Sequence, residues 1–218
     1  MTTLAAPPSL VAGAPGSQIL NNVSWDTYTR LLWEVGPGAT RFVYDQGRLE
    51  IMTVSGDHEG VKKAAARVLE FLAIEFNWRL DGLGNVTLRR RDFEVGLEPD
   101  ECYYVVTPFP AIDRRELDLI KNPPPDLAIE VEITKSAIGK LPIYGKIGVR
   151  EVWRWTGEAF VVFERRPDGE YNERESSGLL PAMQLEQLAE WTRRSLAEGQ
   201  SAALQALRAS LRAGGPAK

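Results

Sequence analysis

The stretch PDLAIEVEIT, residues 125–134, alternates apolar and acidic residues along most of its length. Because successive side chains of a β-strand point to opposite faces, its apolar residues share one face and its acidic residues share the other. Glu130 and Glu132 then project side by side. Neighbouring carboxylates repel each other unless a cation neutralises them, so the pattern indicates a strand that carries a charged site.

A second acidic run, EPDE at residues 98–101, precedes another strand-like segment at residues 102–106. If the two strands are neighbours in a sheet, Asp100 adds a further carboxylate to the same place. Two such strands therefore predict a cluster of carboxylates rather than an isolated charge.

Two lysines follow the first strand, Lys135 at its end and Lys140 at the start of a predicted helix. A strand, a pair of carboxylates and a following lysine form a unit suited to chemistry. The alternative is an amphipathic edge strand whose Glu130 and Glu132 are simply solvated.

The composition suits one globular domain, with 218 residues of which 44% are hydrophobic and 26% charged. A net charge of -4 is not the strong positive field of a protein that coats nucleic acid, so any such contact must use local basic patches. One cysteine and one histidine exclude an internal disulfide and the usual zinc sites, which leaves oxygen ligands and favours Mg²⁺ or Mn²⁺. No leader or membrane span is recognisable, so we expect a cytoplasmic protein.

The rest of the chain predicts interleaved helices and strands. Residues 1–22, rich in Pro, Gly, Ala and Ser, are expected to form a flexible arm. Helices are predicted from the N-cap Ser24 to near Gly36, over 57–78 and over 185–211, with Gly199 as a candidate break in the last. Strands are predicted at 42–44, 49–52, 85–90, 102–106, 126–134, 151–155 and 159–164. This order favours an α/β or α+β class around a central mixed sheet.

Several short motifs occur in a fixed order. They are DQGRLEIM (45–52) with His58-Glu59 after it, EPD (98–100), PPDLAIEV (124–131), LPIY (141–144) and GVREVWRW (148–155). In this order they resemble the Uma-two family of bacterial endonucleases, over roughly residues 24–192. The resemblance implies a restriction-endonuclease-like domain at 23–192, with a mixed central sheet flanked by helices, and leaves 193–218 as a C-terminal helical tail.

That family has the catalytic pattern PD…(D/E)xK, and the resemblance assigns its two acidic positions to Asp100 and Glu130. The sequence departs from the simplest pattern because Glu132 stands where the lysine is expected. Lys140 matches the family's lysine near the helix start better than Lys135 does.

Hydrolysis of a phosphodiester needs an activated water and stabilisation of the negative charge that develops on phosphorus. On this interpretation Asp100 and Glu130 bind Mg²⁺ or Mn²⁺, with the carbonyl group of Val131 as a neutral ligand. Lys140 orients the water or stabilises the charge on the phosphate.

Three further residues are candidates for the same site. Glu132 is either another metal ligand or a partner of Lys140, and Glu50, at the end of a hairpin strand, completes the acidic cluster. His58, at the start of the long helix, is expected to contact phosphate, although a lone histidine is more often structural.

The leading hypothesis is a metal-dependent endonuclease that acts on DNA. A catalytically degenerate member that serves as a nucleic-acid-binding or protein-interaction module is the first alternative, and a structural scaffold is the second. We also expect a homodimer, because two strands must be cut and because residues 151–164 and the last helix offer apolar surface. Packing of that helix against its own domain is the competing explanation.

Overall fold

Two six-stranded sheets and five α-helices make up the described part of the chain. The computed structural model describes residues 8–12, 16–36, 38–53, 55–110, 117, 119–132, 136 and 138–214. Sheet A contains, in spatial order, β1 (Ser9–Ala12), β2 (Ser17–Asn21), β4 (Arg48–Thr53), β3 (Thr40–Asp45), β7 (Val95–Leu97) and β6 (Leu88–Arg90). Sheet B contains β12 (Tyr171–Arg174), β11 (Phe160–Arg165), β10 (Glu151–Trp155), β9 (Leu127–Val131), β8 (Glu101–Tyr104) and β5 (Asp81–Gly82).

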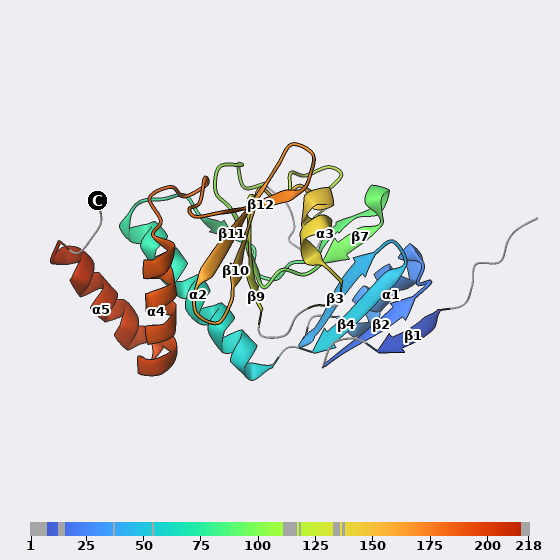
Figure 1. Ribbon diagram of the computed structural model, residues 1–218, viewed down its shortest axis with the longest axis horizontal. Helices are drawn as coiled ribbons and strands as arrows, with labels where there is room; N and C mark the ends of the chain where they lie inside the picture. Colours follow the sequence, from blue (N-terminus) through green and yellow to red (C-terminus); the bar gives the residue numbers. More distant parts are fainter. Residues whose placement is uncertain are drawn as a thin grey trace, which may run out of the picture.

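The helices connect and flank these sheets, as Figure 1 shows. They are α1 (Trp25–Val35), α2 (Gly56–Glu75), α3 (Lys140–Ile147), α4 (Leu185–Glu198) and α5 (Gln200–Arg212). Sheet A and α1 form one end of the elongated molecule, α4 and α5 form the other, and α2 runs between them. Within the described ranges no helix is long and apolar enough to cross a membrane.

The strand β9 lies inside sheet B, between β8 and β10. It runs antiparallel to β8 and parallel to β10, and α3 lies in the connection between the two parallel strands. All five residues of β9 are buried, because α2 and α4 contribute side chains to the core on one face and α3 covers the other. The edge-strand alternative, with solvated carboxylates, is therefore wrong: the Glu130 residue is only 4% exposed.

The predicted mixed α/β class is confirmed, but a second sheet accompanies the central one. Residues 9–12 and 17–21, expected to belong to a flexible arm, form β1 and β2 instead; the two strands pair with each other, and β2 also pairs with β4. Ser17 and Ile19 alternate inwards in that strand and are buried, a pattern too short to stand out among the surrounding Pro, Gly and Ala. Residues 1–7 and 13–15 lie outside the described residues.

The remaining predicted elements agree with the structure where they are long and differ from it where they are short. The hairpin, the long helix and the break at Gly199 are confirmed. The strand predicted at 85–90 is shortened to Leu88–Arg90, and β5, β7 and β12 were not predicted, since segments of two to four residues carry too little periodicity. The end of the strand predicted at 126–134, from residue 133 onwards, lies outside the described residues.

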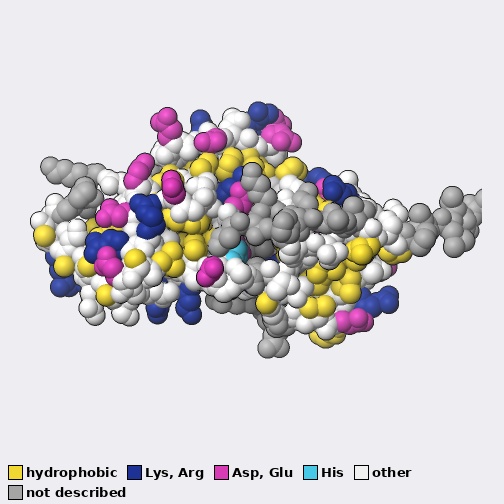
Figure 2. All heavy atoms as spheres, turned by 60° about the horizontal axis from the view of Figure 1, so that its bottom comes forward, with side chains coloured by type: hydrophobic (Ala, Val, Ile, Leu, Met, Phe, Trp, Pro, Cys, Tyr) yellow, Lys and Arg dark blue, Asp and Glu magenta, His cyan; other side chains and the backbone are white. Residues whose placement is uncertain are grey.

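The last two helices pack against their own domain. Leu188, Trp191 and Leu207 are buried in the core cluster that α2 and sheet B also build. Trp153 and Phe160, from the hairpin that was expected to offer apolar surface, are buried in the same cluster. Around α4 and α5 the face drawn in Figure 2 intersperses basic and acidic side chains. Much of the apolar surface that suggested a dimer is therefore buried within one chain, while Leu196 of α4 stays 46% exposed.

We predict that Gly145→Ala destabilises the protein, because a Cβ atom at this position of α3 overlaps the backbone carbonyl oxygen of Gly169. A backbone atom cannot rotate aside as a side chain can, so the expected loss is about 1–3 kcal/mol in the free energy of unfolding. Urea denaturation measures it. The matched control is Gly56→Ala in α2, where a Cβ meets nothing within 4 Å and we expect a change below about 0.5 kcal/mol. Equal stability of the two variants would contradict the close approach of α3 to Gly169, which lies between β11 and β12.

Candidate active site

A buried ion pair joins β9 to α3. The Nζ atom of Lys140 lies 2.6 Å from Oε2 of Glu130, and the hydroxyl group of Tyr144 donates to the other oxygen of the same carboxylate. Lys140 and Tyr144 are four residues apart, so they lie on one face of the helix, one turn from each other. Both oxygens of Glu130 are thus held by α3.

The local sequence explains where α3 begins. Gly139 precedes the first turn and Pro142 lies within it, where the missing N–H of proline removes no helical hydrogen bond. Ile143 and Ile147, on the same side of the helix as Tyr144, bury it in the core beside sheet B. The helix start is therefore fixed close to the end of β9, and Lys140 contacts Glu130 as its position in the sequence predicts.

Asp100 is the second buried carboxylate, at 3% exposure. The register of β8 and β9 pairs Glu101 with Ile129, and one step further along places Asp100 opposite Glu130. Its Oδ2 atom accepts the backbone N–H of Val131 at 2.7 Å and lies 3.1 Å from Nε2 of His58 in α2. Three elements that are distant in the sequence therefore meet at this carboxylate.

The charges of the site are unequally stabilised. Burial acts to raise the pKa of Asp100, but the hydrogen bond from His58, the charge of Lys140 and the Val131 amide outweigh it, so this pKa is lowered. Burial raises the pKa of Glu130, and Lys140 opposes that shift only in part. Burial would lower the pKa of Lys140, yet the charges of Glu130 and Asp100 raise it. Lys140 thus keeps its proton, and Asp100 beside it is ionised.

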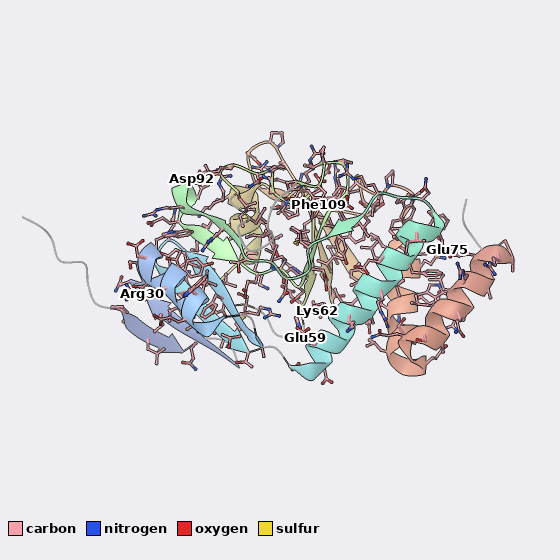
Figure 3. All side chains as sticks on the ribbon, turned by 180° about the vertical axis from the view of Figure 1, so that it is seen from behind. Arg30, Glu59, Lys62, Glu75, Asp92 and Phe109 are labelled. Atoms are coloured by element: carbon pink, nitrogen blue, oxygen red, sulfur yellow. The ribbon has the colours of Figure 1, made fainter. Side chains whose placement is uncertain are left out.

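These side chains line a cavity of about 220 Å³ between sheet A, the start of α2 and sheet B. Its charged and hydrogen-bonding side chains include Arg41, His58, Glu98, Asp100, Glu130, Glu132, Ser136, Lys140, Tyr144 and Arg154. On α2, Glu59 and Lys62 lie close together on the side that faces sheet A, as Figure 3 shows. Their charges are 2.6 Å apart.

The other predicted site residues have different positions. Glu132 lines the cavity but forms its ion pair with Arg154, at 3.2 Å, rather than with Lys140. Glu50 is fully buried in sheet A, where it accepts hydrogen bonds from the hydroxyl group of Ser136 and from the N–H of Ile138. It therefore anchors the segment that leads into α3. Its carboxylate is not part of the cavity lining.

Several sequence expectations concern neighbouring residues. Lys135, the second candidate lysine, lies outside the described residues. Asp126 has a structural role, because one oxygen of its carboxylate accepts the backbone N–H groups of three successive residues, from Val105 to Thr107. Cys102 is a core residue as predicted, and burial raises the pKa of its thiol well above the ordinary range.

A divalent ion of the kind that the PD…(D/E)xK pattern implies needs oxygen ligands. Asp100 and Glu130 offer two, and a carboxylate has more acceptor positions than the hydrogen bonds found here occupy. No cluster of three or more His, Cys, Asp or Glu side chains suited to a metal is found within the described ranges. Asp100 and Glu130 could thus hold such an ion between them, and the Val131 carbonyl group as a further ligand stays a prediction.

Sequence reasoning missed several polar residues of the cavity, among them Tyr144 and Arg41. Tyr144 was part of a quoted motif, and its spacing of four from Lys140 was the signal that connects it to Glu130. Arg41 gave no signal, because only the packing of sheet A against sheet B brings it into the cavity lining.

Comparisons with known proteins give the family of this chain. A family model described as "Uma2: Putative restriction endonuclease" matches residues 25–202, which is most of the chain. The chain belongs to the Uma2 family. Membership places it among nuclease-like proteins, and the matched range contains every residue of the site described above. The resemblance inferred from the motifs is thereby confirmed.

One solved structure is similar in outline. It is described as a putative nuclease belonging to DUF820 from Anabaena variabilis, with 13% sequence identity and a TM-score of 0.46. The alignment covers 84% of this chain and 99% of that one. No curated protein matches the chain.

We predict a pH-dependent effect of Glu101→Gln, next to Asp100. Burial, together with Glu70 and Asp100 and against the charge of Lys62, raises the pKa of Glu101 from 4.5 to about 7. The folded state therefore binds a proton that the unfolded state releases, so this group's contribution to stability falls as the pH rises from 4.5 to about 7. The melting temperature of the variant relative to the wild type should rise across that interval. A difference that is independent of pH would contradict the burial of this carboxylate.

Proposed function

We propose that this chain is a divalent-metal-dependent endonuclease that hydrolyses phosphodiester bonds in DNA. The observation that carries the proposal is the Glu130–Lys140 ion pair beside Asp100 in one cavity. Burying three ionisable groups is costly, and a fold without need of their chemistry is more simply stabilised by apolar residues. Carboxylates that can hold a divalent ion beside a lysine suit phosphodiester hydrolysis.

Each residue has a distinct task in this proposal. Asp100 and Glu130 hold the ion, which when bound lowers the pKa of its water and stabilises charge on the phosphate. Asp100 is suited to this because its lowered pKa keeps it ionised, and the Val131 amide fixes its orientation. Lys140 remains cationic and presents its ammonium group to negative charge on the phosphate. Tyr144 fixes the Glu130 carboxylate from the second side.

We predict that Glu130→Gln and Asp100→Asn each reduce Mn²⁺-dependent nicking of supercoiled plasmid to background. Both substitutions keep the size of the side chain and remove the charge that binds the cation. Nicking should also stop when EDTA removes the metal from the wild type. The control is Glu164→Gln, which alters a carboxylate in a surface ion pair with Arg174 and should leave the rate unchanged. Full activity of Glu130→Gln would remove the central claim.

We further predict that Lys140→Met lowers the rate of nicking by roughly 100-fold, as expected when a group that stabilises the transition state is lost. Because the lysine is not a metal ligand, Mn²⁺ should still raise the melting temperature of this variant. Differential scanning fluorimetry measures that shift. If Lys140→Met cleaves normally and Lys135→Met does not, the catalytic lysine is Lys135.

The degenerate-member alternative is favoured by one observation, the glutamate at position 132 where the family pattern has lysine. Such a protein would bind nucleic acid and metal without cutting. The placement of Lys140 against Glu130 weakens this alternative, because the cation that the pattern requires is supplied from α3. Cleavage by the wild-type protein decides between them.

DNA as the substrate is the part of the proposal with the least support from surface charge. The basic residues Lys62, Arg67 and Arg90 could form local patches for a nucleic-acid backbone, but Lys62 is paired with Glu59, Arg67 with Gln200 and Arg90 with Asp92. The homodimer also remains a prediction: Leu188, Trp191 and Leu207 are buried within one chain, whereas Leu196 is 46% exposed. Two copies would place one site on each DNA strand.

A further inference from the structure

Arg41 belongs to sheet A but lines the cavity that contains the carboxylates of sheet B. It is only 6% exposed. Its Nη1 atom donates to the carbonyl oxygens of Gly38 and Thr40, and its Nη2 atom lies 3.6 Å from Oε1 of Glu59. Its buried Nε atom has no hydrogen-bond partner among the described residues.

A buried guanidinium donor without an acceptor is energetically unfavourable, by an amount that exceeds the gain from an ordinary hydrogen bond. Such a group persists where a ligand supplies the missing acceptor. The guanidinium fork presents donors in one plane and matches the oxygens of a phosphate group better than a lysine ammonium does. The unpaired Nε of Arg41 therefore indicates an anionic ligand.

The other cations of the cavity are already neutralised. Lys140 is paired with Glu130 at 2.6 Å and Arg154 with Glu132 at 3.2 Å. The nearest ion pair of Arg41 is longer, at 3.6 Å, and its partner Glu59 has a side chain that is 41% exposed. Within the described part of the chain, Arg41 is thus the cavity cation whose charge is least satisfied.

The cavity as a whole does not attract an anion by itself, because Arg41, Lys140 and Arg154 face four carboxylates, those of Glu98, Asp100, Glu130 and Glu132. A divalent cation at Asp100 and Glu130 would reverse that balance. An anion that enters the metal-loaded cavity then meets Arg41 on the side of sheet A. The same anion meets Lys140 on the side of sheet B.

We propose that Arg41 is the phosphate-binding residue of this site, and that it holds a backbone phosphate of a bound nucleic-acid strand against the carboxylate centre. The proposal rests on the proposed nuclease function and adds the substrate contact from sheet A. It gives that sheet a direct part in binding, beyond the anchoring of the segment before α3 by Glu50.

The competing explanation is that Arg41 merely neutralises Glu98. Glu98 lines the same cavity, and its Oε2 atom is buried without a hydrogen-bond partner among the described residues. Burial raises the pKa of Glu98, and the charge of Arg41 acts in the opposite direction. The two residues are therefore coupled, and the experiment must separate a counterion from a phosphate ligand.

The test measures the affinity of the full chain for a short fluorescein-labelled oligodeoxythymidine by fluorescence anisotropy, in Ca²⁺, over a series of salt concentrations. Arg41→Gln should weaken binding roughly tenfold, as expected for the loss of a charge-assisted hydrogen bond. The slope of log affinity against log salt should become less steep by about 0.7, the value for one phosphate of a single strand. Arg208→Gln makes the same charge change in a surface ion pair with Glu75 and should alter neither quantity.

The double variant Arg41→Gln/Glu98→Gln removes both buried charges, so it is expected to fold even if Arg41→Gln alone does not. If Arg41 binds phosphate, the double variant remains defective in affinity and slope. If the double variant binds the oligonucleotide like the wild type, Arg41 is only a counterion of Glu98 and the proposal is overturned. Unchanged affinity of a folded Arg41→Gln protein also overturns it while leaving the nuclease function intact. A wild-type protein without salt-dependent binding overturns both.

Discussion

The ion pair between Glu130 and Lys140 is the interaction on which the site depends, because it joins the central strand β9 to the helix that follows it. Both charges are removed from water, and the attraction between them has to offset that desolvation. Tyr144 contributes a further hydrogen bond to the same carboxylate. Removing either partner of such a pair leaves an uncompensated buried charge, which typically costs about 3–5 kcal/mol. Helix α3 is thus held by the same contact that would serve the chemistry.

The site is assembled from parts of the chain that are distant in sequence. Sheet B supplies Asp100 and Glu130, the start of α2 supplies His58, and sheet A supplies Arg41 from the opposite side of the cavity. The connection before α3 is held by Glu50 across 86 residues of chain. Sheet A therefore has two effects on the site: it fixes the segment that carries Lys140, and it places a guanidinium group in the cavity.

Three side chains of this cavity are incompletely satisfied, and outside it the described residues show the same for Tyr28, Glu59 and Ser195. Asp126 and Glu151 are also buried carboxylates, but each accepts several hydrogen bonds from backbone and side-chain donors. Arg41, His58 and Glu98 each retain a buried polar atom without a hydrogen-bond partner among the described residues. Native structures rarely leave such atoms unpaired, and their concentration in one cavity is the physical mark of a place where a ligand binds.

The sequence alone identified the central strand and its charged face, because a period of two is legible without any tertiary information. It also located the start of α3, since Pro142 restricts where a helix can begin, and the division of the last helical segment at Gly199. The PD motif selected Asp100 as the partner of Glu130. Each of these inferences depends on a local preference of the backbone or on a short motif.

Only the tertiary structure decided which acidic residues enter the cavity. Glu50 and Glu132 were equally plausible as ligands, yet one anchors a loop and the other pairs with Arg154, because the packing of the two sheets and the register of β9 with β10 determine their neighbours. The role of Arg41 and the strand β7 left no local signal. Position 96 of β7, for instance, must be glycine because a Cβ atom there would overlap the hydroxyl group of Tyr28. The two residues are 68 positions apart in the sequence. Contacts of this kind arise from burial across the whole chain, which a short window of sequence does not encode.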